Sequence, residues 1–348
     1  MVVAETKAVD VTAVTARNGE ESRTWKQIVE PVNPFLDQVA HRLAEQVETF
    51  EPQIALYAQY ALTNQGKQLR PALVALSAGT VGTANDSLVT VAVIIEMVHL
   101  ATLVHDDVMD EAVIRRRRPT LAATWGNEIS VLLGDCLFAH ALQLAASFPT
   151  PEVCRAVAAA TKTVCSGEIL QTQGRNEFPL SRAEYFKVLE MKTAELFALS
   201  CTLGAGLCGA SPVERGALRS YGLALGTAYQ IYDDCLDVFG SEAAAGKSLG
   251  TDLANGKLTL PVLVALERGT VADRRRLKEL IGHGQGGNVP AVVELLGRYE
   301  SLEESRRVIH GFLGRARQSV SVLPESEDRL SLIRLAGFLA EQTDALGV

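Results

Sequence analysis

Apolar residues recur every three or four positions along most of this chain, the spacing that gathers them on one face of an α-helix. The two clearest stripes comprise Leu218, Tyr221, Leu225, Ala228, Tyr232 and Leu236, and Tyr185, Val188, Leu189, Leu196 and Leu199. Alternating polar and apolar runs that end in Asn-Gly or Asp-Gly turns, the signature of hairpin strands, are nearly absent. The pattern therefore predicts an all-α protein built of long helices, without a sheet.

Prolines and glycine-rich loops separate the helical segments. Beyond residue 60, prolines stand at positions 71, 119, 149, 151, 179, 212, 261, 290 and 324, and glycine-rich loops occupy residues 79–86, 240–256 and 282–288. None of these loops resembles a flexible domain linker. We therefore expect a flexible N-terminal tail over residues 1–25 and a single all-α domain over residues 26–348.

The composition is that of a well-packed globular protein. Of 348 residues, 47% are hydrophobic, and 33 basic side chains oppose 41 acidic ones, which gives a net charge of −8. Disordered chains contain fewer apolar residues, collagens contain far more glycine, and nucleic-acid-binding proteins are usually basic. The composition therefore excludes the first two classes and argues against a nucleic-acid partner.

The cysteines and the apolar segments indicate a cytoplasmic protein. The six cysteines occur singly, so we expect them to be reduced, and the first 25 residues lack the apolar run of a signal peptide. The most membrane-like segment, Leu88–Val104, has 17 residues and contains Glu96 and His99, whereas a membrane-spanning helix needs about 20 apolar residues. We therefore predict a buried helix there and no transmembrane segment.

One acidic motif occurs twice. Asp106, Asp107 and Asp110 form DDVMD, and Asp233, Asp234 and Asp237 form DDCLD, 233 − 106 = 127 residues later. On a helix with about 100° per residue, the three carboxylates of each motif lie on one side. Because like charges within a turn repel each other and aspartate is a poor helix former, a bound cation would stabilise each motif.

Carboxylate oxygens without nearby cysteine or histidine favour Mg²⁺, which normally shares its coordination shell with substrate phosphates. The two motifs therefore predict Mg²⁺ and a diphosphate ligand. The alternative is that each motif is a solvated helix face. The duplication argues against it, and so do the apolar residues directly before each motif, Leu100–Val104 and Ala228–Tyr232.

Basic residues near the motifs supply candidate partners for phosphate. Four consecutive arginines, at 115–118, follow the first motif, and arginine binds phosphate through a bidentate fork. Such a run is also typical of a nucleic-acid or nuclear-import patch, but the adjacent acidic residues cancel its field. Further cations, each of which is equally a candidate for surface solvation, are Lys67, Arg70, Lys192, Lys247 and Lys257.

These residues lie in motifs that resemble the trans-isoprenyl diphosphate synthase, or polyprenyl synthetase, family. The motifs are GKQLRP at 66–71, EMVHLATLVHDDVMD at 96–110, RRRRPT at 115–120, GDCLFA at 134–139, GEILQ at 167–171, KTAELF at 192–197, YQIYDDCLD at 229–237 and GKSLGTDLANGKLTLP at 246–261. They follow one another in the family's order, which makes the resemblance specific. Two departures are Arg117, where the family usually has glycine, and Tyr229, where phenylalanine is commoner.

The resemblance implies the isoprenoid synthase fold, a bundle of helices around a central cavity, usually in a homodimer, with the two aspartate motifs facing each other across the cavity mouth. It implies a prenyltransferase that condenses isopentenyl diphosphate with an allylic diphosphate to make a trans-polyprenyl diphosphate. Three Mg²⁺ ions per active site would assist, and the product would partition to membranes. No protein nucleophile is needed.

By matched position, the resemblance assigns roles to individual residues. The most direct metal ligands would be Asp106, Asp110 and Asp233, with Asp107, Asp234 and Asp237 supporting them. The allylic diphosphate would contact Arg115, Lys192, Thr193, Gln230, Lys247 and Lys257. The isopentenyl diphosphate would contact Gly66, Lys67, Arg70, His99 and Arg116, although His99 by itself is also typical of a core histidine. Catalysis would depend on the two aspartate pairs, Asp110, Arg115, Lys192 and Lys247.

Product length in this family depends on the depth of the apolar cavity below the first motif. Ala101 stands five residues before Asp106, where short-chain enzymes of the family often carry an aromatic stopper. Met97, one turn lower, is bulky but flexible. We therefore expect a medium or long chain, with farnesyl or geranylgeranyl diphosphate synthase as the alternative.

Other functions fit the sequence less well. Gly246-Lys247-Ser248 suggests a P-loop nucleotide hydrolase, but five residues separate Gly240 from Gly246 instead of four, and no strand precedes them. A terpene cyclase or squalene-type synthase would leave Lys67 and Arg70 without a purpose. An inactive helical scaffold subunit would not need two intact aspartate motifs.

Overall fold

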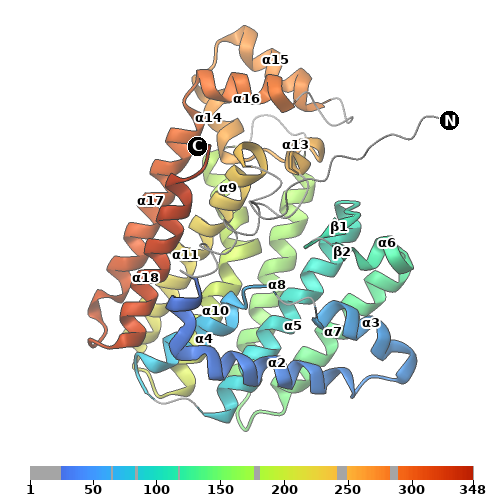
Figure 1. Ribbon diagram of the computed structural model, residues 1–348, viewed down its shortest axis with the longest axis vertical. Helices are drawn as coiled ribbons and strands as arrows, with labels where there is room; N and C mark the ends of the chain where they lie inside the picture. Colours follow the sequence, from blue (N-terminus) through green and yellow to red (C-terminus); the bar gives the residue numbers. More distant parts are fainter. Residues whose placement is uncertain are drawn as a thin grey trace, which may run out of the picture.

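The computed structural model describes residues 25–63, 66–82, 85–116, 118–175, 181–240, 249–282 and 289–347. Figure 1 shows a bundle of long helices with a smaller group, α14 to α16, at one end. The α-helices are α2 (Asn33–Val47), α3 (Pro52–Thr63), α4 (Leu69–Gly79), α5 (Asp86–Met109), α6 (Leu121–Trp125), α7 (Asn127–Ala146), α8 (Glu152–Gln173), α9 (Arg182–Leu189), α10 (Glu195–Leu207), α11 (Pro212–Phe239), α13 (Thr251–Ala254), α14 (Leu260–Arg268), α15 (Val271–Gly282), α16 (Val289–Arg298), α17 (Ser301–Ser319) and α18 (Glu327–Asp344). The predicted all-α fold is confirmed.

Three short helical segments and one hairpin complete the described chain. The segments are η1 (Glu30–Val32), the π-helical η2 (Glu190–Ala194) and η3 (Val320–Val322). The hairpin pairs β1 (Ile114–Arg115) with β2 (Arg118–Pro119). It was not predicted from the pattern, because two residues per strand are too few to show an alternation.

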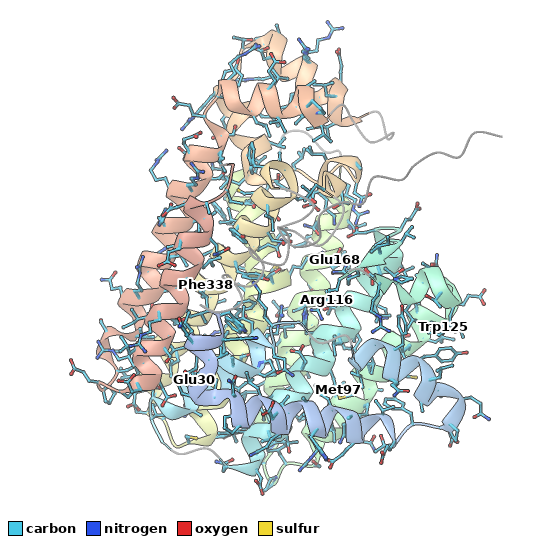
Figure 2. The ribbon with its side chains drawn as sticks, in the orientation of Figure 1. Glu30, Met97, Arg116, Trp125, Glu168 and Phe338 are labelled. Atoms are coloured by element: carbon cyan, nitrogen blue, oxygen red, sulfur yellow. The ribbon has the colours of Figure 1, made fainter. Side chains whose placement is uncertain are left out.

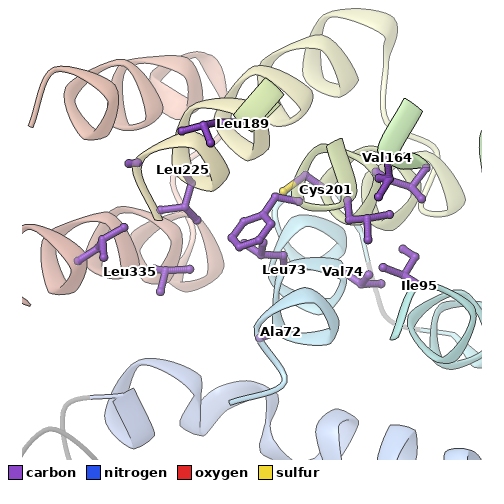
Figure 3. Packing of buried hydrophobic residues seen from close by; sticks show 14 of the residues in the cluster. Ala72, Leu73, Val74, Ile95, Val164, Leu189, Cys201, Leu225 and Leu335 are labelled. Carbon is purple, nitrogen blue, oxygen red and sulfur yellow. The ribbon is translucent and has the colours of Figure 1, made fainter. Parts of the chain in front are cut away.

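Helix α10 lies at the centre of the core, where it packs against α4, α5 and α11 (Figure 3). Close packing with α11 depends on Gly222, since a Cβ atom there would lie 2.7 Å from the Cα of Ala198 and from the carbonyl oxygen of Phe197. The start of α11 is fixed by interactions between neighbouring residues. Ser211 and Glu214 form a capping box at its first turn, and Pro212 occupies the first helical position.

Helix α5 is apolar on nearly all sides and is buried in the core. It has 14 buried residues, including Met97 and Ala101, which confirms the buried helix predicted over Leu88–Val104. By length and composition, α5 and α7 are each long enough to cross a membrane. The protein buries 72% of the apolar stretch of α5 but only 33% of that of α7, so α7 has a face turned outward.

Candidate active site

The two aspartate motifs lie at the C-terminal ends of α5 and α11. Asp110 is the residue that ends α5, and Asp233, Asp234 and Asp237 lie in the last two turns of α11. A helix C-terminus carries a partial negative charge, which disfavours carboxylates. Both motifs therefore need cations or hydrogen-bond donors from elsewhere in the fold.

The first motif receives cations from several segments of the chain. The Nε of Arg115 lies 2.5 Å from the Oδ1 of Asp107, and the Nζ of Lys257 lies 2.7 Å from the Oδ2 of Asp110. The Nζ of Lys192 lies 3.7 Å from the Oδ2 of Asp106 and also pairs with Glu168. The predicted residues Arg115, Lys192 and Lys257 thus converge on the first motif.

Burial and these cations act in opposite directions on the carboxylates. Burial raises the pKa of Asp106, against the charge of Lys192, and it raises the pKa of Asp107 against the charge of Arg115. Burial also acts to raise the pKa of Asp110, but Lys257, Lys192 and Arg175 together offset it and leave this pKa below its ordinary value. Asp110 is therefore the carboxylate whose charge the surrounding cations favour most.

A π-helical turn positions Lys192 and Thr193. This turn, Glu190–Ala194, interrupts the helix between α9 and α10, and π-turns occur frequently at functional sites. Gly167 of α8 lies against it, since a Cβ atom there would be 2.9 Å from the backbone nitrogen of Lys192. Close contact with α8 brings Lys192 within 2.9 Å of the Oε1 of Gln171.

The second motif is held by hydrogen bonds. The hydroxyl of Tyr185 donates to Asp234 at 2.6 Å, and the Nε2 of Gln230 donates to its other oxygen at 2.8 Å. The hydroxyl of Thr193 donates to the Oε1 of Gln230 at 2.8 Å, so Thr193 and Gln230, both predicted, belong to one network. Burial, with the negative charge of Asp252, raises the pKa of Asp234 to about 7.

Asp237, the last acid of the second motif, is buried against the start of α13. It is completely buried, and its carboxylate accepts hydrogen bonds from the hydroxyl of Thr251 at 3.0 Å and from the backbone N–H of Asp252 at 3.1 Å. Both donors lie in the first turn of α13. Asp237 therefore fixes the start of α13, which leads to Lys257.

A cavity lies between the elements that carry these residues. Its polar lining consists of Gln171, Arg175, Tyr185, Lys192, Gln230, Asp234, Asp252, Lys257 and Thr259. Its apolar lining includes Leu170, Leu189 and Leu258. A lining that combines cations and hydrogen-bond donors with leucines suits an amphipathic ligand with an anionic head.

A second group of cations surrounds the buried carboxylate of Glu96. Burial raises the pKa of Glu96, and the charges of Arg70 and Arg116 oppose that rise. Burial, together with the charges of these two arginines, lowers the pKa of His99 well below its usual value, which leaves a neutral imidazole. Arg70 also stacks over the ring of Phe197, with 5.0 Å from its Cζ to the ring centroid.

The isopentenyl candidates Gly66 and Lys67 precede Arg70 in the GKQLRP motif. A Cβ atom on Gly66 would lie 2.7 Å from the Nη2 of Arg116, so a larger residue there would have to displace that guanidinium. Lys67 lies 5.7 Å above the ring of Phe338 from α18. Arg116 has φ +50°, which is a strained backbone for a residue with a side chain. Figure 2 shows Arg116 inside the bundle, with Glu168 above it and Met97 below it.

The described residues contain no group of three His, Cys, Asp or Glu side chains close enough to hold a metal ion. In the first motif, the carboxylates of Asp107 and Asp110 pair with cations of the protein. The donor set nevertheless fits Mg²⁺, because it consists of carboxylate oxygens. Lys247 and Arg117 lie outside the described residues, so the predictions for them stay predictions.

Several site residues were missed by reasoning from the sequence. Glu168 and Gln171 stand in the GEILQ motif, so their proximity to Lys192 could have been anticipated. Tyr185 had been assigned to an apolar stripe, and Arg175 lies in no motif. Nothing local in the sequence marks these two, because their contacts, Asp234 and Asp110, lie 49 and 65 residues away.

Known proteins with similar sequences and folds agree on one family. The family profile of polyprenyl synthetases matches residues 51–296. A short-chain isoprenyl diphosphate synthase of Methanothermobacter thermautotrophicus is 33% identical over 91% of this chain and 99% of its own. The crystal structure of a Rhodobacter capsulatus decaprenyl diphosphate synthase is 33% identical, with a TM-score of 0.86 over 92% of this chain and 99% of that one. A Caulobacter crescentus polyprenyl synthase complexed with calcium and isoprenyl diphosphate is 31% identical, with a TM-score of 0.86 over 91% and 97% of the two chains.

Proposed function

Because this chain belongs to the polyprenyl synthetase family, we propose that it condenses isopentenyl diphosphate with an allylic diphosphate to make a trans-polyprenyl diphosphate of medium or long chain. One observation carries the proposal. Lys192 and Lys257 line a single cavity with Gln230 and Asp234 of α11 while they pair with Asp106 and Asp110 of the first motif. Anion-binding cations and metal-binding carboxylates thus share one cavity.

The family is metal-dependent, and we assign the metal to Mg²⁺, three ions per active site. The candidate ligands are Asp106, Asp107, Asp110, Asp233, Asp234 and Asp237. Bound Mg²⁺ supplies positive charge that neutralises the diphosphate as the carbon–oxygen bond breaks. Asp106, Asp110 and Asp233 are the direct ligands in this proposal. Asp234 and Asp237 support them, because their carboxylates accept hydrogen bonds from Tyr185, Gln230, Thr251 and Asp252.

The allylic diphosphate lies, in this proposal, against Arg115, Lys192, Thr193, Gln230, Lys247 and Lys257. The cations stabilise the negative charge that develops on the leaving diphosphate. The carbon–oxygen bond of the allylic substrate breaks and leaves an allylic carbocation. The double bond of isopentenyl diphosphate attacks that cation and forms the new carbon–carbon bond, and the released diphosphate accepts the proton that the adduct loses.

Isopentenyl diphosphate lies, in this proposal, against Gly66, Lys67, Arg70, His99 and Arg116. Burial lowers the pKa of Arg70 and that of Arg116, and the charge of Glu96 opposes both decreases. His99 stays neutral, because burial and the two arginines hold its pKa well below the usual value. A neutral imidazole donates one hydrogen bond to a phosphate oxygen without adding charge. The negative charge of the buried Glu96 favours the charged form of both arginines.

The growing chain extends, in this proposal, along α5 past Ala101 and Met97. Both side chains are fully buried on this helix. Ala101 offers no aromatic barrier near the first motif, which favours a medium or long product. Farnesyl and geranylgeranyl diphosphate are the shorter alternatives.

We also infer a cytoplasmic homodimer whose product partitions to membranes. The outward face of α7 supports the dimer, because Val131 and Leu132 are 41% and 61% exposed in a single chain. Adjacent apolar side chains on a long helix are typical of a surface that a second copy covers.

Incubation with isopentenyl diphosphate, Mg²⁺ and either farnesyl or geranylgeranyl diphosphate, followed by mass-spectrometric sizing of the products, tests the proposal. We expect elongation by several units, and no elongation from any allylic primer would refute it. Asp106→Ala and Asp233→Ala should each abolish turnover with unchanged helical circular dichroism. Asp37→Ala is the matched control, because Asp37 is exposed on α2 and its loss should leave turnover intact.

A further inference from the structure

The end of α8 contributes a cation to the first aspartate motif that belongs to no recognised motif. Arg175 follows Gly174, the residue that caps α8. Its Nη2 lies 2.7 Å from the Oδ1 of Asp110, and its Nη1 lies 3.4 Å from the carbonyl oxygen of Met109. The guanidinium therefore closes over the C-terminal end of α5, where the helix dipole also favours a positive charge.

The carboxylate of Asp110 consequently pairs with two cations at once. Arg175 occupies one carboxylate oxygen and Lys257 occupies the other, each at 2.7 Å. A divalent cation that uses Asp110 as a ligand competes with both of them for the carboxylate oxygens. A cation that it displaces stays beside the diphosphate cavity, because Arg175 and Lys257 both line that cavity together with Lys192.

The guanidinium of Arg175 also has unused donor capacity. Its Nε is buried and has no hydrogen-bond partner among the residues that the structure describes. The side chains of Arg175 and Asp110 are each 19% exposed, so the unpaired N–H is largely shielded from water. A buried donor without a partner is unfavourable, and a diphosphate in this cavity would provide acceptor oxygens for it.

We propose that Arg175 is a substrate-positioning residue that neutralises Asp110 in the metal-free enzyme and transfers its guanidinium to the diphosphate when the divalent cation binds. The inference rests on the proposed function, because it requires the cavity to hold a diphosphate ester. Arginine suits this exchange, since its planar fork matches a carboxylate and a phosphate equally well. The exchange couples metal binding to substrate binding through one side chain.

The coupling gives the Arg175→Gln variant two effects of opposite sign. Without diphosphate, loss of the competing cation should tighten Mn²⁺ binding, measured by electron paramagnetic resonance of free Mn²⁺, by about threefold to tenfold. With Mn²⁺ bound, loss of the fork should weaken inorganic pyrophosphate binding, measured by calorimetry, by about tenfold or more, the size of a charge-assisted hydrogen bond. Arg175→Lys keeps the charge without the fork, so Mn²⁺ binding should match the wild type while pyrophosphate binding is weakened.

A purely structural role gives a different pattern. It would lower the melting temperature and weaken both ligands together, and that result would overturn the proposal. An unchanged pyrophosphate affinity in Arg175→Gln would overturn it as well. Arg155→Gln is the matched control, because Arg155 is exposed near the start of the same helix and should change neither affinity.

Failure of this inference is distinguishable from failure of the proposed function. Elongation by the wild-type enzyme tests the function, whereas the two affinities of Arg175→Gln test the exchange. A wild type that elongates, with an Arg175→Gln variant that binds both ligands like the wild type, would refute the exchange alone. If Arg175→Gln does not fold, the pyrophosphate affinity of Arg175→Lys decides, and wild-type affinity would overturn the proposal.

Discussion

The hydrogen bond between Tyr185 and Asp234 predicts a stability change that depends on pH. Tyr185→Phe removes only the hydroxyl, which donates to Asp234 at 2.6 Å, and keeps the ring in its packed position. Tyr185 is 4% exposed and Asp234 is 5% exposed, so water does not replace the lost donor. A hydrogen bond to a charged group contributes about 1.5–3 kcal/mol, and we expect the free energy of unfolding to fall by about this amount where Asp234 is ionised.

The sign of the pH dependence follows from the pKa of Asp234. Burial raises that pKa to about 7, while the hydrogen bond from Tyr185 acts to lower it. An acid whose pKa is raised by folding contributes stability at low pH, and this contribution is lost as the pH rises towards its folded pKa. Tyr185→Phe raises the pKa of Asp234 further, because it removes a donor to the carboxylate. The deficit of the variant should therefore be small near pH 5 and reach its full size above pH 7.

Urea unfolding at several pH values, at one protein concentration and with a metal chelator present, measures this difference. Tyr221→Phe is the matched control, because the buried hydroxyl of Tyr221 donates at 2.7 Å to the carbonyl oxygen of Leu332, which does not titrate. Its deficit should be about 1 kcal/mol at every pH. Equal, pH-independent deficits in the two variants would refute the assigned role of Asp234.

Three further predictions concern the cavity, the core and the cation pairs. Ala101→Phe should shorten the product by one or more isoprene units in a mass-spectrometric assay, whereas the small substitution Ala101→Ser should leave the length unchanged. An unchanged length in Ala101→Phe would contradict the assigned path. Gly222→Ala should destabilise the fold by about 1–3 kcal/mol in urea unfolding, because its Cβ atom would lie 2.7 Å from the backbone of Ala198; wild-type stability would show that α10 and α11 can separate freely. Lys257→Gln should raise the KM for the allylic diphosphate by about tenfold, since Lys257 lines the cavity beside Asp110, and an unchanged KM in steady-state kinetics would remove Lys257 from the site.

Much of the candidate site can be predicted from the sequence because the motifs are short. The spacing within DDVMD and DDCLD places each set of carboxylates on one side of a helix, whatever surrounds it. The resemblance then extends the set to Lys192, Thr193, Gln230 and Lys257, and the structure brings these four together. The ligand roles of these residues stay proposals.

The sequence by itself determined the all-α class and the apolar stripes of single helices, because helical hydrogen bonds and caps join residues only three or four positions apart. The apolar stripe of α11 and its capping box are both of this kind. Only the tertiary structure decided which cations meet which carboxylates. Lys257 and Asp110 are 147 residues apart, and Arg175 and Asp110 are 65 apart. Such pairs depend on how closely whole helices pack. That distance depends on the size of single side chains against residues far along the sequence, as where Gly222 lies against Ala198.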